Sequence, residues 1–136
     1  MLNEPIWISP EGVVQINRRL VGQTGEPHSL LDRGLLEGAC ERPKNRWAYS
    51  NDEDVVSLGC VLMFGLAKNH PFLQGNKRTG FTAMIGFLGA NGFRLVMADQ
   101  AEAADFIREV IEGKATEEAF IDALRPHVVP VFPLER

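Results

Sequence analysis

Residues 70–80 read His-Pro-Phe-Leu-Gln-Gly-Asn-Lys-Arg-Thr-Gly. They lie between two strongly apolar segments, which predict a helix on each side of the stretch. A Gly75-Asn76 pair opens the second of these helices. Backbone N–H groups in the first turn of a helix have no partner within the helix, and the helix dipole favours negative charge there. The stretch therefore predicts two helices joined by a loop that is suited to binding a phosphate.

The side chains of this loop add the groups that phosphate chemistry needs. Gly75 and Asn76 are expected to hold phosphate oxygens through their backbone N–H groups, assisted by the Asn76 side chain. Lys77 would supply a point charge and Arg78 a bidentate guanidinium. Imidazole titrates near neutral pH, which makes His70 the candidate general base for a hydroxyl group. The alternative interpretation is a surface turn with a satisfied histidine, but the ordered combination of these groups favours the phosphate site.

The stretch resembles the signature of the Fic/Doc superfamily, His-Pro-Phe-x-[Asp/Glu]-Gly-Asn-[Gly/Lys]-Arg. Lys77, where most Fic proteins have glycine, indicates the death-on-curing (Doc) branch. Residues 30–43 (LLDRGLLEGACERP), 58–69 (LGCVLMFGLAKN) and 87–92 (FLGANG) are also similar to segments of that branch. The resemblance spans about residues 5–125.

The resemblance implies a helical bundle and a toxin of a type II toxin–antitoxin system. A Doc-like toxin would transfer the γ-phosphate of ATP to a hydroxyl of a protein target, such as elongation factor Tu, and would be held inactive by a Phd-like antitoxin. Mg²⁺ would accompany the ATP. The alternatives are Fic-type transfer of AMP, and a catalytically weak module of the same fold that binds a nucleotide or a protein.

Two positions depart from the family pattern. Gln74 stands where the family has a metal-binding acid, and its neutral oxygen is a poorer Mg²⁺ ligand than a carboxylate, so Gln74 is a weak candidate for the metal site. Phe81 stands where adenylylating Fic enzymes carry a second arginine. The second departure favours phosphoryl transfer over AMP transfer.

The hydrophobic pattern predicts an all-α fold of about six helices, in a single domain over residues 1–136. The expected helices cover residues 10–20, 32–42, 55–67, 76–90, 99–112 and 116–125. Segment 55–67 is apolar on all sides and should form the centre of the bundle. In the fourth helix Gly80, Gly86 and Gly89 are expected to let a neighbouring helix approach closely. The proline-rich tail, residues 126–136, is expected to be extended.

Residues 44–50 (KNRWAYS) follow Pro43, which is expected to end the second helix. Aromatic residues alternate with other residues here, so a short extended or hairpin segment is one interpretation. An exposed loop with one packed tryptophan is the other. The resemblance implies a flap beside the active site, which binds a target segment by β-augmentation. Asn45, Arg46 and Trp47 would then be the target-binding residues.

Bulk properties restrict the function class further. The 136 residues contain 14 Lys and Arg against 18 Asp and Glu, and the net charge of −4 argues against general nucleic-acid binding. Cys40 and Cys60 lie in apolar helical patterns, as expected for buried reduced thiols of a cytoplasmic protein. Neither a secretory signal nor a membrane span is visible, so no membrane association is expected. His28 and His127 are interpreted as solvated residues without a chemical role.

Overall fold

The computed structural model describes residues 3–97 and 100–131. It contains the helices α1 (Pro10–Gln23), α2 (Arg33–Ser50), α3 (Val55–Asn69), α4 (Asn76–Ala90), α5 (Gln100–Ile111) and α6 (Glu117–Leu124), a 3-10 turn (Arg125–His127), and the strands β1 (Phe93–Leu95) and β2 (Val128–Pro130). The two strands pair antiparallel. The predicted all-α class is confirmed, since the described residues form only this short two-stranded sheet. No helix in the described ranges has the length and apolar character needed to cross a membrane.

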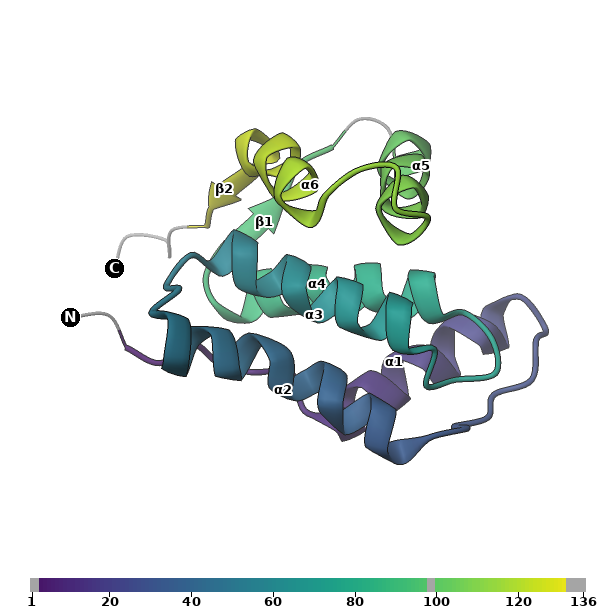
Figure 1. Ribbon diagram of the computed structural model, residues 1–136. Coiled ribbons are helices and arrows are strands. Elements are labelled where there is room, and N and C mark those ends of the chain that lie inside the picture. Colours follow the sequence, from purple (N-terminus) through teal and green to yellow (C-terminus); the bar gives the residue numbers. More distant parts are fainter. Residues whose placement is uncertain (1–2, 98–99, 132–136) are drawn as a thin grey trace.

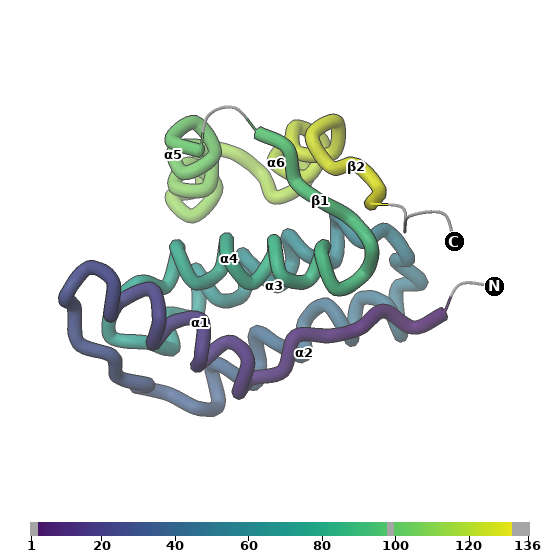
Figure 2. The backbone as a smooth tube through the Cα atoms, turned by 180° about the vertical axis from the view of Figure 1, so that it is seen from behind, coloured from purple at the N-terminus to yellow at the C-terminus, as the bar shows by residue number. Residues whose placement is uncertain are grey.

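The centre of the structure is α3 (Figure 1). Every residue from Val56 to Ala67 is buried, which explains why the segment is apolar on all sides. Helices α2 and α4 pack against α3, and α1 packs on α4. Helices α5 and α6 and the two strands lie together on the side of α3 and α4 that faces away from α1 and α2, as both views show (Figures 1 and 2). The loop between α3 and α4, which holds residues 70–75, lies at one end of these helices, and the turn between α2 and α3 lies at the opposite end.

Side-chain caps start several of the helices. Ser9 Oγ accepts a hydrogen bond from the Gly12 N–H at 3.1 Å, and Pro10 occupies the first helical position of α1. Asp54 caps α3 and Thr116 caps α6 in the same way. Helix α4 begins and ends at the predicted residues. The expected start of the fifth helix at Asp99 lies outside the described residues, whereas its end falls one residue before the predicted one, at Ile111.

Two buried clusters surround α3. One lies between α3, α4, α5 and α6, and the other lies between α1, α2, α3 and α4. The first includes Phe64, whose ring meets Phe120 edge-on with centroids 5.3 Å apart. The second holds Phe72 from the loop of residues 70–75, so that this loop is anchored directly in the core.

The predicted end of the second helix at Pro43 is wrong, because α2 continues to Ser50. An internal proline costs a helix about 3 kcal/mol. Here Pro43 is itself buried and continues an apolar stripe spaced by three and four residues along the face that packs against α3. The stripe consists of Leu36, Ala39, Cys40 and Pro43. Burial of this stripe offsets the lost hydrogen bond.

Residues 44–50 are therefore helical, and both interpretations of them, an extended or hairpin segment and an exposed loop, are wrong. Asn45 is exposed on α2, Arg46 forms ion pairs, and the Trp47 ring packs edge-on against Trp7 with centroids 6.2 Å apart. At 1.5 Å per residue these side chains lie about 20 Å along α2 from its start at Arg33, which is the end near the loop of residues 70–75 (Figure 1). They do not form a flap beside that loop.

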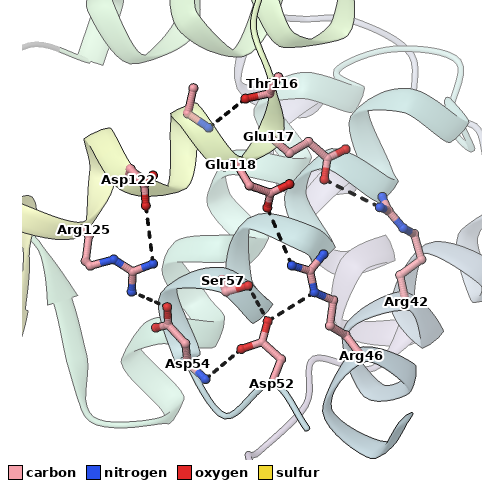
Figure 3. Close-up of polar contacts among 11 residues, drawn as sticks. Arg42, Arg46, Asp52, Asp54, Ser57, Thr116, Glu117, Glu118, Asp122 and Arg125 are labelled. Carbon is pink, nitrogen blue, oxygen red and sulfur yellow. Dashed lines mark hydrogen bonds and ion pairs between the residues drawn. The ribbon is translucent and has the colours of Figure 1, made fainter. Parts of the chain in front are cut away.

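Arg46 instead belongs to a group of ion pairs that joins α6 to α2 and to the turn before α3 (Figure 3). Its guanidinium contacts Asp52 at 3.2 Å and Glu118 at 3.8 Å, and Arg42 contacts Glu117 at 3.7 Å. These side chains are partly exposed, so each pair contributes at most about 1 kcal/mol. They supplement the apolar packing of α6 against the central helix.

The structure adds detail at three places. The inward face of α1 carries Val13, Asn17 and Val21. Residues 93–95, expected as part of a link, form β1. The tail is extended only at residues 128–130, where pairing with β1 provides backbone hydrogen bonds; residues 132–136 lie outside the described ranges.

Substituting Gly80 by alanine is expected to destabilise the fold by about 1–3 kcal/mol. A Cβ atom at this position would lie 2.7 Å from the Met63 carbonyl oxygen, which is backbone of α3 and cannot move aside cheaply. A Cβ atom at Gly89, on the same helix, would meet no neighbouring atom within 4 Å, so Gly89→Ala should stabilise the fold by up to about 1 kcal/mol. Urea unfolding of both variants measures the difference, and equal stability would contradict the close approach of α3 and α4.

Candidate functional site

The loop of residues 70–75 is held in a defined shape by two left-handed residues. His70 ends α3 with φ 51°, and Gly75 precedes α4 with φ 75°. Glycine is needed at the second position, since an added Cβ would be strained and would lie 3.0 Å from Val21 and 3.2 Å from the Arg78 guanidinium. Gly75 also offers no capping side chain. The first backbone N–H groups of α4 therefore remain available to an anion.

The segment before α2 runs alongside this loop. Phe72 pairs with Leu30 in an isolated antiparallel bridge. The Leu31 N–H donates to the Pro71 carbonyl at 2.8 Å, and the Leu73 N–H donates to the Ser29 carbonyl at 2.9 Å. Residues 29–32, rather than residues 44–50, are thus the extended segment beside the site. The sequence did not predict this extended segment, because a single bridge is too short to show an alternation of apolar and polar residues.

The structure corrects the role expected for the Asn76 side chain. Asn76 is buried, and its Oδ1 accepts from the Phe72 N–H at 3.0 Å while its Nδ2 donates to the Phe72 carbonyl at 2.8 Å. Both ends of the amide are therefore used to close the loop on itself. The Asn76 side chain therefore positions the loop, whereas the start of α4 has no side-chain cap.

The same amide contacts the candidate base. Asn76 Nδ2 lies 3.2 Å from His70 Nδ1. Because the contacts with Phe72 fix which end of the amide is nitrogen, Nδ1 must be the acceptor, and a neutral His70 ring then carries its proton on Nε2. To accept a proton from a substrate, the ring must give up this contact, either to expose Nδ1 or to move its own proton there. His70 is exposed, so the ring has room to turn.

Asn17 is a second buried amide that supports the loop. Its Nδ2 donates to the Gln74 carbonyl at 2.8 Å and to Thr79 Oγ1 at 2.9 Å. Its Oδ1 lies 2.8 Å from His28 Nδ1, which must therefore carry a proton. The sequence signal for Asn17 was a polar residue at the centre of the inward face of α1.

His28 is not the solvated loop residue that the sequence suggested. Its ring is half-buried and lies 6.0 Å from the Phe72 ring, and desolvation lowers the pKa of His28. With its Nδ1 bonded to Asn17, the ring holds the segment of residues 24–32 against the loop. We assign it a structural role.

The two cations of the loop differ in their surroundings. Lys77 is exposed at the start of α4. Arg78 is also largely exposed, but its Nη2 contacts the Glu26 carboxylate at 2.5 Å. Thr24 also donates to that carboxylate, and the hydrogen bonds from Thr24 and Arg78 lower the pKa of Glu26. An incoming phosphate must therefore compete with a carboxylate for Arg78.

Replacing Glu26 by glutamine is expected to strengthen binding of an inorganic triphosphate several-fold at low salt, because Arg78 loses its anionic partner. Glu11→Gln is the matched control, since Glu11 forms an equally short pair at 2.5 Å with Arg33, which is not one of the cations of the loop. Calorimetric titration with tripolyphosphate measures both variants. Unchanged affinity in Glu26→Gln would mean that Arg78 does not take part in anion binding.

The residues around the loop suit a metal only weakly. Among the described residues, no group of three His, Cys, Asp or Glu side chains is arranged to hold a metal ion. Gln74 is exposed, and only its backbone carbonyl is fixed, by Asn17. Mg²⁺ prefers carboxylate and phosphate oxygens, so an ion here would depend on a bound nucleotide and water, with at most an amide oxygen from Gln74.

Both cysteines are free and buried, as predicted. Burial raises the pKa of the Cys40 thiol to about 11 and that of Cys60 still further. Neither thiol is therefore a nucleophile at neutral pH.

Comparison with known proteins agrees with this geometry. Residues 7–88 match the model of the Fic/DOC family, and this range includes the whole of the loop and nearly all of both helices beside it. The chain is 27% identical over 118 residues to the "Protein kinase doc" of Escherichia phage P1, covering 87% of this chain and 92% of that protein. It is 34% identical over 98 residues to the "Toxin Doc" of Mycolicibacterium smegmatis, covering 70% of this chain and 72% of that protein. With more than half of its length matched by the family model and the loop intact, the chain belongs to the Fic/Doc family, on its death-on-curing side.

Proposed function

We propose that this chain is a Doc-like toxin that transfers the γ-phosphate of ATP to a hydroxyl group of a protein target, such as elongation factor Tu, in the cytoplasm. The observation that carries the proposal is the juxtaposition of His70 with the open start of α4, held together by the buried Asn76 side chain. A base and an anion site within one rigid loop are the requirements for moving a phosphoryl group to a hydroxyl.

The proposed reaction is a single displacement at the γ-phosphorus. The target hydroxyl oxygen forms the new P–O bond, its proton passes to the His70 imidazole, and the bond to the β-phosphate oxygen breaks to release ADP. Backbone N–H groups at the start of α4 hold the transferred phosphate, and Lys77 and Arg78 stabilise the charge on its oxygens. Mg²⁺ bound to the nucleotide would offset part of the phosphate charge. The reaction needs the His70 ring to leave Asn76, a movement that target or nucleotide binding would drive.

The surface beside His70 suits a protein substrate. Leu31, Leu35 and Leu73 are 61%, 41% and 46% exposed. All three lie on segments bonded to the loop or to the end of α3: Leu31 and Leu73 through the bridge described above, and Leu35 through its carbonyl, which accepts from Asn69 Nδ2 at 3.0 Å. Exposed leucines around a base support a target that brings an apolar segment as well as a hydroxyl.

Transfer of label from ATP tests the proposal directly. Purified protein is incubated with γ-labelled or α-labelled ATP and a bacterial lysate, and then with purified elongation factor Tu. Label from the γ-position alone on a protein is the expected result. Label from the α-position would establish AMP transfer instead, and no label from either would favour a binding module, the alternative that the missing acid at Gln74 supports.

A cognate antitoxin of the Phd type is the proposed partner. Both named relatives belong to the Doc group, one of them called a toxin, and an unrestrained enzyme of this kind would stop the growth of its own cell. The antitoxin would be disordered alone and would fold against this chain. Expression of the chain with and without the adjacent reading frame tests this, and harmless expression of an active chain alone would refute it.

Restoring the acid, Gln74→Asp, is expected to raise the transfer rate about tenfold at limiting Mg²⁺, corresponding to about 1.4 kcal/mol. A carboxylate attracts the ion more strongly than an amide, and the exposed side chain leaves the loop undisturbed. Mg²⁺ titration of both proteins in the same assay gives the comparison. Equal or lower activity of the variant across the titration would show that the missing acid does not limit the reaction.

A further inference from the structure

The turn between α2 and α3 lies at the end of the helices opposite the loop of residues 70–75, and it borders a second cavity, of about 830 Å³. The other walls of this cavity come from the N-terminal segment, the end of α4, β1, the 3-10 turn and β2. The volume is in the range that binds small organic ligands. The proposed reaction makes no use of this cavity, so its lining indicates a separate binding site.

Side-chain hydrogen bonds fix the walls of the cavity. The Asn91 amide holds the N-terminal segment, because its Oδ1 accepts from the Ile6 N–H at 2.8 Å and its Nδ2 donates to the Ile6 carbonyl at 2.9 Å. In the turn before α3, the Asp52 carboxylate accepts from Ser57 Oγ at 2.6 Å and pairs with Arg46 at 3.2 Å. The cavity is therefore formed before any ligand binds.

Much of the lining is apolar and includes an aromatic side chain. The apolar lining residues are Ile6, Trp47, Val55, Val56, Phe93 and Val128. Trp47 is partly buried, and its ring is held edge-on against Trp7. The indole ring of tryptophan attracts organic cations more strongly than any other side chain ring does.

The charged groups of the lining also favour a cation. Glu4 and Glu53 line the cavity, and neither forms an ion pair with any other residue in the described ranges. Arg125 is the one cation among the described lining residues, and its guanidinium is already paired with Asp54 and Asp122 (Figure 3). The lining therefore presents two uncompensated carboxylates, which come from separate segments of the chain.

An inorganic cation suits this lining poorly. Across the described part of the chain, no three His, Cys, Asp or Glu side chains are grouped to hold a metal ion, and an apolar wall offers no oxygen ligands. An organic cation can use both kinds of lining. Its ammonium groups pair with the carboxylates, while its carbon chain packs against the aromatic and aliphatic side chains.

We propose that this cavity binds an aliphatic polyamine. One ammonium group pairs with Glu4 and another with Glu53, and the methylene chain packs against Trp47. Two carboxylates on separate segments select a ligand with at least two ammonium groups over a monoamine. The bound polyamine connects the N-terminal segment to the turn before α3 and leaves the loop of residues 70–75 free.

Calorimetric titration with spermidine, and with butylamine as the monoamine, tests the proposal in about 0.1 M salt, which screens weak attraction to the acidic surface. The double variant Glu4→Gln/Glu53→Gln removes both carboxylates, which are exposed, so it should fold normally. Glu109→Gln/Glu112→Gln is the matched control, since it changes the net charge equally at two exposed residues that do not line the cavity. Thermal unfolding is recorded for each protein.

The natural protein and the control should bind spermidine at least about tenfold more tightly than butylamine, and Glu4→Gln/Glu53→Gln should weaken spermidine binding by about tenfold or more. Equal spermidine affinity in the two double variants would mean attraction to net charge alone and would overturn the proposal. So would the absence of spermidine binding to the natural protein, or butylamine binding as tight as that of spermidine.

Tryptophan fluorescence locates the bound polyamine. The chain contains two tryptophans, so Trp7→Phe leaves Trp47 as the only one. Spermidine should change the emission of this variant in a saturable way, with the dissociation constant that calorimetry gives for the same variant. Calorimetric binding without any change in Trp47 emission would place the ligand elsewhere and refute the assignment to this cavity.

Discussion

Replacing His70 by alanine should lower the rate of phosphoryl transfer by about 10²–10⁴ and abolish growth arrest, while tripolyphosphate still binds. The base is the group that the reaction cannot replace, because water at neutral pH takes the hydroxyl proton far less readily. Anion binding is assigned to the backbone of α4 and to Lys77 and Arg78, none of which depends on the imidazole. The expected change is therefore in the catalytic rate and not in the affinity for phosphate.

The backbone at His70 requires a second variant. Its φ of 51° is left-handed, which alanine adopts less readily than asparagine does. His70→Asn keeps this backbone conformation without supplying a base, and it should be as inactive as His70→Ala. A transfer rate within a few-fold of the natural protein in both variants would mean that His70 is not the base. Activity retained only in His70→Asn would assign the residue a structural role in the loop.

Leu62→Asp is expected to unfold the protein. Leu62 lies on α3 and is 1% exposed, in the cluster between α1, α2, α3 and α4. An unpaired carboxylate there costs several kcal/mol, which is most of the stability of an ordinary domain. The loop would be lost as well, because Phe72 is anchored in the same cluster.

Ile85→Asp is the control for this variant. Ile85 is 38% exposed on α4, so a carboxylate there keeps its water and should change the stability by about 0.5 kcal/mol or less. Circular dichroism and urea unfolding separate the two variants. A folded, cooperative Leu62→Asp protein would contradict the position of this residue in the core.

The sequence by itself determined the helical fold and identified residues 70–80 as the candidate site. Caps such as Ser9 and Thr116 act on groups within one turn of themselves, so their effect is visible locally. The apolar character of segment 55–67 likewise identified the central helix. A helix that is apolar on all sides is expected to be buried on all sides, whichever elements pack against it. Residues 70–80 carried the family signature, the candidate base and the helix start in one stretch.

Only the tertiary structure decided how far α2 extends and what the polar residues near the loop do. Pro43 ends a helix in isolation, but packing against α3 outweighs the lost hydrogen bond. The Asn76 side chain closes the loop, and Asn17 supports the loop from α1. Glu26 forms an ion pair with Arg78. The contact between Asn17 and Gln74, for example, joins positions that are 57 residues apart in the sequence. Such partners are chosen by burial and by the relative position of helices, which no local pattern of residues encodes.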